Sequence, residues 1–261
     1  MQAVSSEIKA PSLFLFWAEW RAAVEFGSLA LSLPWLGTLP KGDGHPVLVL
    51  PGLSADDSST VALRMFLRNR GYQAYGWNLG RNVGYRSGMR ERQIERLKEI
   101  HERHDGQKVS LIGWSLGGLY ARELAKQAPD LVRQVITLGS PFKGNPRASN
   151  AWRLYESLAG HSVDKVRESL HVEVPPDVPF SSVYSRTDGI VAWECSIEEE
   201  GERRENIEIR GSHCGLGHNP LAYYVIADRL AQNEGGWRPF KGGEANRDWF
   251  PEPARYADIA S

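Results

Sequence analysis

The chain has 261 residues, of which 41% are hydrophobic and 24% charged, and its formal net charge is −1. This length fits one large domain or two small ones, and the composition is that of an ordinary soluble globular protein. The charge excludes the basic excess of a nucleic-acid-binding surface and an acidic tail, so we expect no nucleic-acid partner.

The first expected element is an amphipathic helix at about residues 12–26. Its apolar positions at helical spacing are Leu13, Phe16, Trp17, Trp20 and Val24, with Glu19, Arg21 and Glu25 between them. We expect the apolar face to pack on the body of the domain. Contact with a membrane surface is the alternative, and it would be at most peripheral because the polar face is poor in Lys and Arg.

Nothing in the first residues predicts export or a membrane span. Residues 1–10 lack a positive segment followed by an apolar run, and the charge-free stretch 26–40 is too short to span a bilayer. The default expectation is therefore a cytoplasmic protein. A chain whose signal had been removed, and which was secreted, would look the same.

Strand and helix patterns then alternate along the chain. The expected strands are 47–50, 73–78, the run that begins at Val109, 132–138, 180–185 and 207–209. The expected helices are 60–70, 93–104, 116–127 and 219–232. This order predicts an α/β fold with a doubly wound, mostly parallel sheet and helices on both faces.

Two segments depart from this alternation. Residues 143–179 contain two short helical patterns and no strand, which predicts a small helical cap over the crevice where such sheets bind ligands. Its aromatic residues would face an acyl-binding groove, or the cap would be a surface helix pair without a ligand. Residues 235–261 are polar and aperiodic and read as a surface tail, so we expect a single domain over 1–261.

The segment Gly113-Trp114-Ser115-Leu116-Gly117 joins an apolar strand to a helix. A serine at such a sharp turn stands exposed at a helix N-terminus, where partial positive charge favours a developing oxyanion. Gly113 and Gly117 are needed because a Cβ at either position would crowd the turn. The alternative is a glycine-rich turn with a buried or capping serine, but the flanking strand and helix favour a nucleophile.

A serine nucleophile needs a base, and the base needs an orienting carboxylate. In this topology the order along the chain is Ser, acid, His. His213 comes soon after the last expected strand and is our candidate base, with His218 as second choice. Asp188 follows a strand end and is our candidate acid, although an Asp-Gly pair is also a common turn. Asp164 and Asp177 fall in the cap, and Asp130 lies at the opposite edge of the sheet.

An oxyanion requires two backbone N–H donors. One should belong to Leu116, the residue after the nucleophile, and the other to the loop after the first strand. Gly52 lets that loop turn inward, so Leu53 is our candidate for the second donor.

These motifs together resemble the α/β-hydrolase superfamily, and within it bacterial lipases and esterases, including the branch similar to GPI-inositol deacylases. The motifs are Leu50-Pro51-Gly52-Leu53, Gly113-Trp114-Ser115-Leu116-Gly117-Gly118, Gly139-Ser140-Pro141-Phe142, Tyr184-Ser185-Arg186-Thr187-Asp188-Gly189-Ile190-Val191 and Gly211-Ser212-His213-Cys214-Gly215-Leu216. The resemblance covers about residues 47–230 and implies Ser115, Asp188 and His213 as triad, with Leu53 and Leu116 at the oxyanion hole. Many lipases have His-Gly where this chain has Pro51-Gly52.

The two cysteines lie beside the candidate acid and base. Cys195 follows Asp188 by seven residues and Cys214 adjoins His213. A disulfide between the two loops is one expectation, and a pair of free thiols, as in a reducing cytosol, is the other. Neither cysteine has metal-ligand spacing, so we expect no metal site.

The sequence thus predicts a serine hydrolase that cleaves a small-molecule or lipid carboxylic ester through an acyl-enzyme, without a cofactor. An acyltransferase or thioesterase with the same triad is one alternative, because cap and water access choose the acceptor. A hydrolase-fold protein that only binds a ligand is the other. The sequence does not give the natural substrate, the acyl chain length or the oligomeric state.

Overall fold

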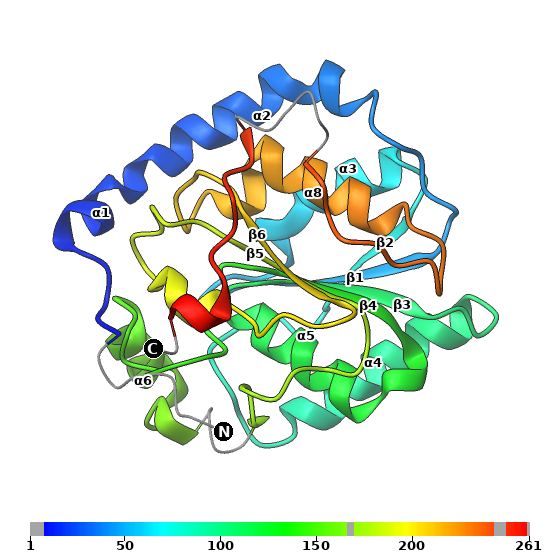
Figure 1. The fold of residues 1–261 in the computed structure, drawn as a ribbon. Coiled ribbons are helices and arrows are strands. Elements are labelled where there is room, and N and C mark those ends of the chain that lie inside the picture. The colour runs from blue at the N-terminus through cyan, green and yellow to red at the C-terminus, as the bar shows by residue number, and fades with distance from the viewer. Residues whose placement is uncertain (1–7, 166–169, 243–248, 260–261) are drawn as a thin grey trace.

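A parallel sheet forms the centre of the structure, a computed structural model that describes residues 8–165, 170–242 and 249–259 (Figure 1). The strands are β1 Pro46–Leu50, β2 Gln73–Gly76, β3 Val109–Trp114, β4 Val132–Leu138, β5 Phe180–Tyr184 and β6 Arg204–Glu208. Their order in the sheet is β2-β1-β3-β4-β5-β6, and every neighbouring pair is parallel.

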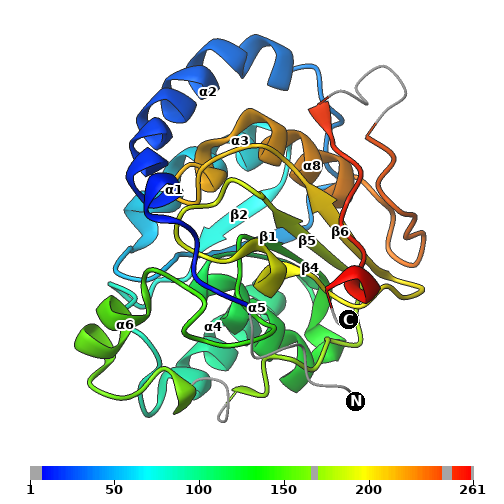
Figure 2. The same cartoon turned by 60° about the vertical axis from the view of Figure 1, so that its left-hand side comes forward.

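Helices cover both faces of this sheet. They are α2 Ala22–Leu36, α3 Val61–Asn69 and α8 Pro220–Leu230 on one side, and α4 Met89–Arg103 and α5 Leu116–Gln127 on the other (Figures 1 and 2). Alternate residues of β1 join different cores: Val47 and Val49 pack with α3 and α8, whereas Leu48 and Leu50 pack with α4 and α5. The predicted doubly wound α/β fold is therefore confirmed.

The strand boundaries differ most from prediction at the edge of the sheet. The last strand begins at Arg204, three residues before the predicted Ile207, and pairs with β5 from Phe180↔Arg204 to Tyr184↔Glu208. Its first two residues are only half-buried and charged. An edge strand with a solvated end carries no continuous apolar run, which is why the sequence pattern covered only its end.

The N-terminal segment differs from prediction in length and in orientation. It consists of α1 Leu13–Trp17, the 3-10 helix η1 Ala18–Arg21 and α2, which ends at Leu36 instead of about residue 26. The prediction that the apolar stripe packs on the domain is wrong, because Leu13 is 72% exposed and Trp17 73% exposed. The charged side chains of this segment turn inward instead. No helix among the described residues is both long and apolar enough to cross a bilayer.

Among its described residues, the segment expected as a cap contains the helix α6 Trp152–Ala159. The second was expected from Val163, Val166 and Leu170, of which Val166 lies outside the described residues. The end of this segment is fixed to α5 by Lys126, whose ammonium group donates to the carbonyls of Leu170 and His171.

A buried cation on α5 holds the same segment. The Arg122 guanidinium donates to the carbonyl oxygens of Val172 and Val174 and lies 2.7 Å from Glu198. Both charged side chains are almost fully buried, and removal of either partner would leave an uncompensated charge in the interior. The helix that begins just after Ser115 is thus tied to the chain that covers it.

Shorter elements complete the described chain. They are η2 Asp57–Thr60, η3 Pro129–Leu131, η4 Trp193–Ser196, η5 Leu216–His218 and η7 Tyr256–Asp258. Part of the expected surface tail packs on the domain, since Ala254 is buried and its N–H donates to the Tyr184 hydroxyl at 2.7 Å.

Candidate active site

Ser115 stands at the sharp turn between β3 and α5. Its backbone has φ 53° and ψ −120°, a conformation that side-chain-bearing residues rarely adopt. Such strain costs of order 1–3 kcal/mol and persists only where packing enforces it. Here a Cβ on Gly113 would lie 2.3 Å from the Gly118 Cα, and one on Gly117 would lie 2.3 Å from the Leu50 carbonyl oxygen. The two glycines therefore allow the close approach that holds the turn.

The structure brings Ser115, His213 and Asp188 together. His213 Nε2 lies 2.9 Å from the Ser115 Oγ, and His213 Nδ1 lies 2.6 Å from Asp188 Oδ2. The other carboxylate oxygen of Asp188 accepts from the N–H groups of Ile190 and Val191 at 2.8 and 2.7 Å. Asp188 is 4% exposed and His213 is 6% exposed. A fixed carboxylate thus orients the imidazole toward the serine.

Charges around the imidazole raise the pKa of His213 above its ordinary value of 6.5. Burial alone would lower this pKa, but the negative charge of Asp188, its hydrogen bond and the charge of Glu19 outweigh burial. The backbone of the base loop is held as well, because the Trp114 indole N–H donates to the His213 carbonyl at 3.1 Å.

Two backbone N–H groups are available beside the serine. Leu116 is the first residue of α5, where the N–H has no partner inside the helix. A Cβ on Gly52 would lie 3.4 Å from the Ser115 Cβ, which places the loop before Leu53 next to the serine. In the part of the chain that the structure describes, neither the Leu53 nor the Leu116 N–H donates to a protein acceptor.

Asn82 holds the loop that contains Leu53. This side chain is fully buried, and its amide Nδ2 donates to the Pro51 carbonyl at 2.9 Å. Its backbone carbonyl accepts from Ser54 at 2.7 Å, and its N–H donates to Ala55 at 2.7 Å. Asn82 was not predicted from the sequence, since a lone asparagine in a loop carries no signal of its own.

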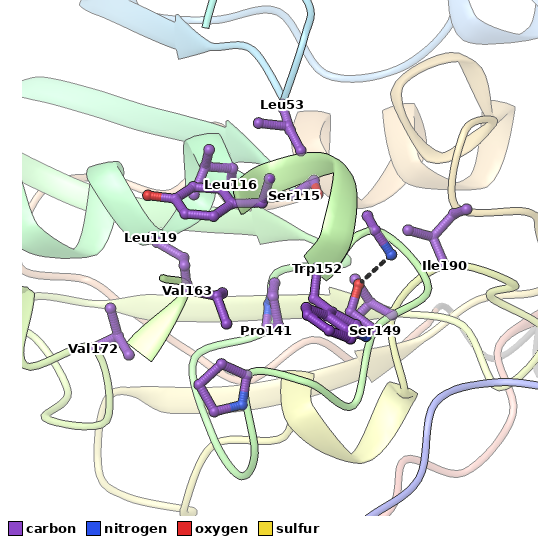
Figure 3. A pocket seen from close by; sticks show the side chains of 14 residues that line it. Leu53, Ser115, Leu116, Leu119, Pro141, Ser149, Trp152, Val163, Val172 and Ile190 are labelled. Atoms are coloured by element: carbon purple, nitrogen blue, oxygen red, sulfur yellow. Dashed lines mark hydrogen bonds between the residues drawn. The ribbon is translucent and has the colours of Figure 1, made fainter. Parts of the chain in front are cut away.

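An apolar pocket opens beside Ser115, with a volume of about 80 Å³. Its lining includes Leu53, Leu116, Leu119, Pro141, Trp152, Tyr155, Val163, Val172, Ile190 and Val191. Figure 3 shows Leu53 and Leu116 beside the serine, with Trp152 and Val163 lining another part of the pocket. The segment expected as a cap thus supplies Trp152 and Tyr155 of α6 to the pocket lining.

Carboxylates from outside the sheet also reach this site. Glu19 in η1 accepts from the backbone N–H groups of Gly189, His213 and Cys214, and Glu25 in α2 accepts from that of Ser212. From the sequence, both carboxylates were expected on the polar face of the helix, without these contacts. They and Arg21 are the charged residues between positions 12 and 36. The small number of charges in this segment was the one signal in the sequence that pointed to them. It does not tell which way the charged side chains face.

The alternative candidates for the base and the acid lie away from Ser115. His218 packs edge-on against Trp114 and Phe26 instead of reaching the serine, and burial lowers its pKa. In the cap, Asp164 pairs with Arg147, and Asp177 lies near Arg203. No group of three or more His, Cys, Asp or Glu side chains among the described residues is arranged to hold a metal ion.

The disulfide considered from the sequence is not formed. Both cysteines are free: Cys195 is buried and Cys214 is exposed. Cys195 packs in an apolar cluster with Ala148, Val191 and Ala192, and burial raises its thiol pKa to about 12. The two cysteines therefore lie in different environments. Their positions on the loops after Asp188 and His213 did not show this.

Comparison with known proteins agrees with this architecture. Residues 46–165 match the alpha/beta hydrolase fold family. A triacylglycerol lipase of Pseudarthrobacter phenanthrenivorans is 31% identical over 112 residues, which cover 39% of this chain and 34% of that protein. A triacylglycerol lipase of Burkholderia plantarii is also 31% identical over 112 residues and is covered to 30%. The chain therefore spans about a third of the length of these relatives.

Solved structures show the same fold at low sequence identity. The mature lipase BlEst2 of Bacillus licheniformis superposes with a TM-score of 0.53 at 17% identity, covering 74% of this chain and 95% of that one. A monoacylglycerol lipase of Paleococcus ferrophilus gives 0.53 at 18% identity, with the same coverage. The protein thus has the α/β-hydrolase fold. Its distant sequence relatives include bacterial triacylglycerol lipases.

A first prediction concerns the protonation of His213. In a histidine NMR titration, its midpoint should lie above 6.5, because Asp188 and Glu19 stabilise the protonated ring. The substitution Asp188→Asn should lower that midpoint, since it removes the nearest negative charge. His218 is the internal control and should titrate below 6.5 in both proteins. A His213 midpoint at or below 6.5 in the unchanged protein would contradict this assignment.

Proposed function

We propose that the protein is a serine esterase that hydrolyses carboxylic esters through an acyl-enzyme on Ser115. The observation that carries this proposal is the chain of contacts from Asp188 to His213 at 2.6 Å and from His213 to Ser115 at 2.9 Å. The serine lies beside an apolar pocket, which suits the acyl part of an ester.

The chemistry depends on these positions. His213 Nε2 takes the hydroxyl proton as the Ser115 Oγ bonds to the ester carbonyl carbon. The N–H groups of Leu53 and Leu116 then stabilise the oxyanion of the tetrahedral intermediate. His213 passes the proton to the departing alkoxide, which leaves as the alcohol.

Water completes the cycle. His213 takes a proton from water, whose oxygen attacks the acyl-enzyme carbonyl, and returns a proton to Ser115 as the acid leaves. Asp188 remains ionised throughout and stabilises the charged imidazolium. Because the neutral imidazole is the base, activity should rise with pH through the raised pKa of His213.

The distant relatives support the choice of an ester substrate. The two relatives described above are named triacylglycerol lipases, and the two superposed structures are named lipases. The resemblance of the motifs to GPI-inositol deacylases stays a prediction about the lipid class. Acyl transfer or thioester hydrolysis would use the same three side chains, so added alcohols and thioester substrates decide among these reactions.

The pocket favours a short acyl group. Its volume of about 80 Å³ is well below the roughly 300–1,000 Å³ of pockets that hold drug-sized ligands. Each methylene that the pocket accepts contributes about 0.8 kcal/mol, or nearly a factor of four in kcat/KM. Chains that exceed the pocket gain nothing further from it.

The central prediction is loss of nucleophilic reactivity on Ser115→Ala. A fluorophosphonate probe should label the unchanged protein and fail to label this variant, and ester hydrolysis should fall by roughly 10⁴-fold or more. Ser87→Ala, at an exposed serine outside the pocket, is the matched control and should label normally. Equal labelling of both variants would place the reactive group elsewhere.

A third prediction concerns acyl chain length. Across a p-nitrophenyl ester series, kcat/KM should be highest for acetyl to butyryl esters and should fall for octanoyl esters. Trp152→Ala should move the optimum to longer chains, because it removes one wall of the pocket. The exposed neighbour Leu154 provides the control substitution Leu154→Ala. An unchanged optimum in Trp152→Ala would show that another wall limits the chain.

A further inference from the structure

The outward face of the N-terminal segment is entirely apolar. Between residues 13 and 34, all of which are described, no exposed residue has a polar side chain. Phe14 is 80% exposed and Leu31 is 86% exposed, and Trp17 and Trp20 lie between them. Even the two serines of α2 are satisfied within the helix, since Ser28 and Ser32 donate to the carbonyls of Glu25 and Ser28.

This face is one continuous outer surface. Figures 1 and 2 show α1 and α2 as the outermost layer on the side of the sheet that α3 and α8 cover. At about 1.5 Å per residue the stretch is roughly 30 Å long, and a helix is about 10 Å wide. Phe14, Trp17 and Trp20 project from it, and each such aromatic side chain can bury about 150–250 Å² against a partner.

The charges of the segment point to a neutral, apolar partner. Its three charged side chains, Glu19, Arg21 and Glu25, bind backbone groups of the loops below it. The face thus offers no cation to an anionic surface and no anion to a basic one. Aromatic and aliphatic side chains without charge are suited to the boundary between lipid headgroups and acyl chains.

The face also adjoins the candidate active site. The Leu15 carbonyl lies against Gly189, where an added Cβ would come within 2.2 Å of it. Gly189 precedes Ile190, which lines the pocket beside Ser115. The Asn150 side chain also connects the N-terminal segment to this loop, since its amide donates to the carbonyls of Pro11 and Gly189 at 3.1 and 2.8 Å.

We propose that the face formed by residues 13–34 docks the protein on a lipid surface by inserting aromatic and aliphatic side chains. Binding depends on apolar contact and is insensitive to anionic lipid. The docked face lies next to the loop that carries Asp188 and Ile190, so an ester drawn from the lipid surface has a short path to the pocket. That last step rests on the proposed function, whereas the docking does not.

Vesicle binding tests the docking. The full-length Ser115→Ala protein is mixed with phosphatidylcholine vesicles, or with vesicles that also contain about 30% phosphatidylserine, and bound protein is separated by flotation. We expect equal binding to both vesicles, and at least a tenfold weaker partition for Trp17→Ser/Trp20→Ser. Trp249→Ser changes a 46% exposed tryptophan outside the segment and should bind normally.

Three outcomes overturn the proposal: no binding to either vesicle, binding only with phosphatidylserine, or a dimer in light scattering that the double variant dissociates. The last would make a second copy the occupant of the face. Hydrolysis of a water-soluble acetyl ester, measured with Ser115 intact, should be unchanged in Trp17→Ser/Trp20→Ser. Vesicle binding without any hydrolysis would reject the proposed function alone.

The inner side of the same segment supports a second inference. Glu19 Oε1 accepts from Gly189 and His213 at 2.8 and 2.9 Å, and Glu19 Oε2 accepts from Cys214 at 2.8 Å. One carboxylate thus joins the loop after Asp188 to the backbone of His213. Hydrogen bonds to a charged acceptor are about twice as strong as neutral ones.

Two glycines make room for this contact. A Cβ on Gly189 would lie 2.2 Å from the Leu15 carbonyl oxygen and 2.9 Å from Glu19 Oε1. A Cβ on Gly215 would lie 1.7 Å from Glu25 Oε2. Any larger residue at either position would push the helical segment away, so the loops and the segment fit each other closely.

We infer that Glu19 is a positioning residue that sets the distance and orientation of His213 relative to Asp188 and Ser115. This inference rests on the proposed function for its kinetic consequence. The charged groups near His213 are Asp188 from the β5 loop, with Glu19 and Glu25 from the N-terminal segment, and Arg21 binds the carbonyls of Thr187 and Gly211.

The variant Glu19→Gln keeps one acceptor oxygen but presents an amide N–H₂ to a backbone N–H and removes the charge. We expect kcat to fall by roughly ten- to a hundredfold, as for small misplacements of a catalytic group, while KM changes less than about threefold. The His213 NMR midpoint and the acid limb of the pH profile should both move to lower pH. Gly189→Ala should lower kcat in the same way.

Glu99→Gln makes the same change at an exposed carboxylate on α4 and is the matched control. A folded Glu19→Gln protein with unchanged kcat and an unchanged His213 midpoint would overturn the inference. So would a lower melting temperature as its sole effect. If the unchanged enzyme neither hydrolyses esters nor reacts with fluorophosphonate, the proposed function fails, and the shift in midpoint still tests Glu19.

Discussion

The strained backbone of Ser115 is the constraint on which the site depends. A residue with φ 53° is stable here because β3 lies inside the sheet and its end is held by neighbours. The Ser115 N–H donates to the Leu138 carbonyl at 2.8 Å, and its own carbonyl accepts from Gly118 at 3.0 Å. The sharp turn at Ser115 is therefore fixed by main-chain contacts with β4 and α5. The position of the Ser115 hydroxyl does not depend on any single neighbouring side chain.

Around this fixed point the other groups come from less constrained loops. Asp188 and His213 come after the ends of β5 and β6, at the side of the sheet where a parallel arrangement gathers strand ends. Loops of this kind sample more conformations than strands do. The contacts made by Glu19, from a helix outside the sheet, restrict these two loops, whereas Asn82 restricts the separate loop that carries Leu53.

Periodicity and local turn chemistry made part of the fold predictable from the sequence. The six strands, their parallel pairing and the sharp turn at Ser115 could be predicted in this way. Buried apolar runs and glycines at close contacts are visible directly in the sequence. The same holds for the choice of Asp188 and His213 as neighbours of the serine, although their catalytic roles remain predictions.

Other features depend on contacts that periodicity does not encode. The predicted orientation of the N-terminal helix was wrong, because burial of an apolar face is the usual rule, and backbone partners for Glu19 appear only in three dimensions. The free state of Cys195 and Cys214 likewise depends on packing, which their spacing along the chain does not reveal.

The long sequence separation of the Glu19 contacts has a consequence for biosynthesis. Residue 19 is synthesised before its partners at 189, 213 and 214, which emerge 170 to 195 positions later. At translation speeds of about 5–20 residues per second, this gap lasts roughly 10–40 seconds. During that interval the Glu19 carboxylate lacks these three backbone partners. The contacts between this helical segment and the loops after β5 and β6 therefore form only after residue 214 has been synthesised.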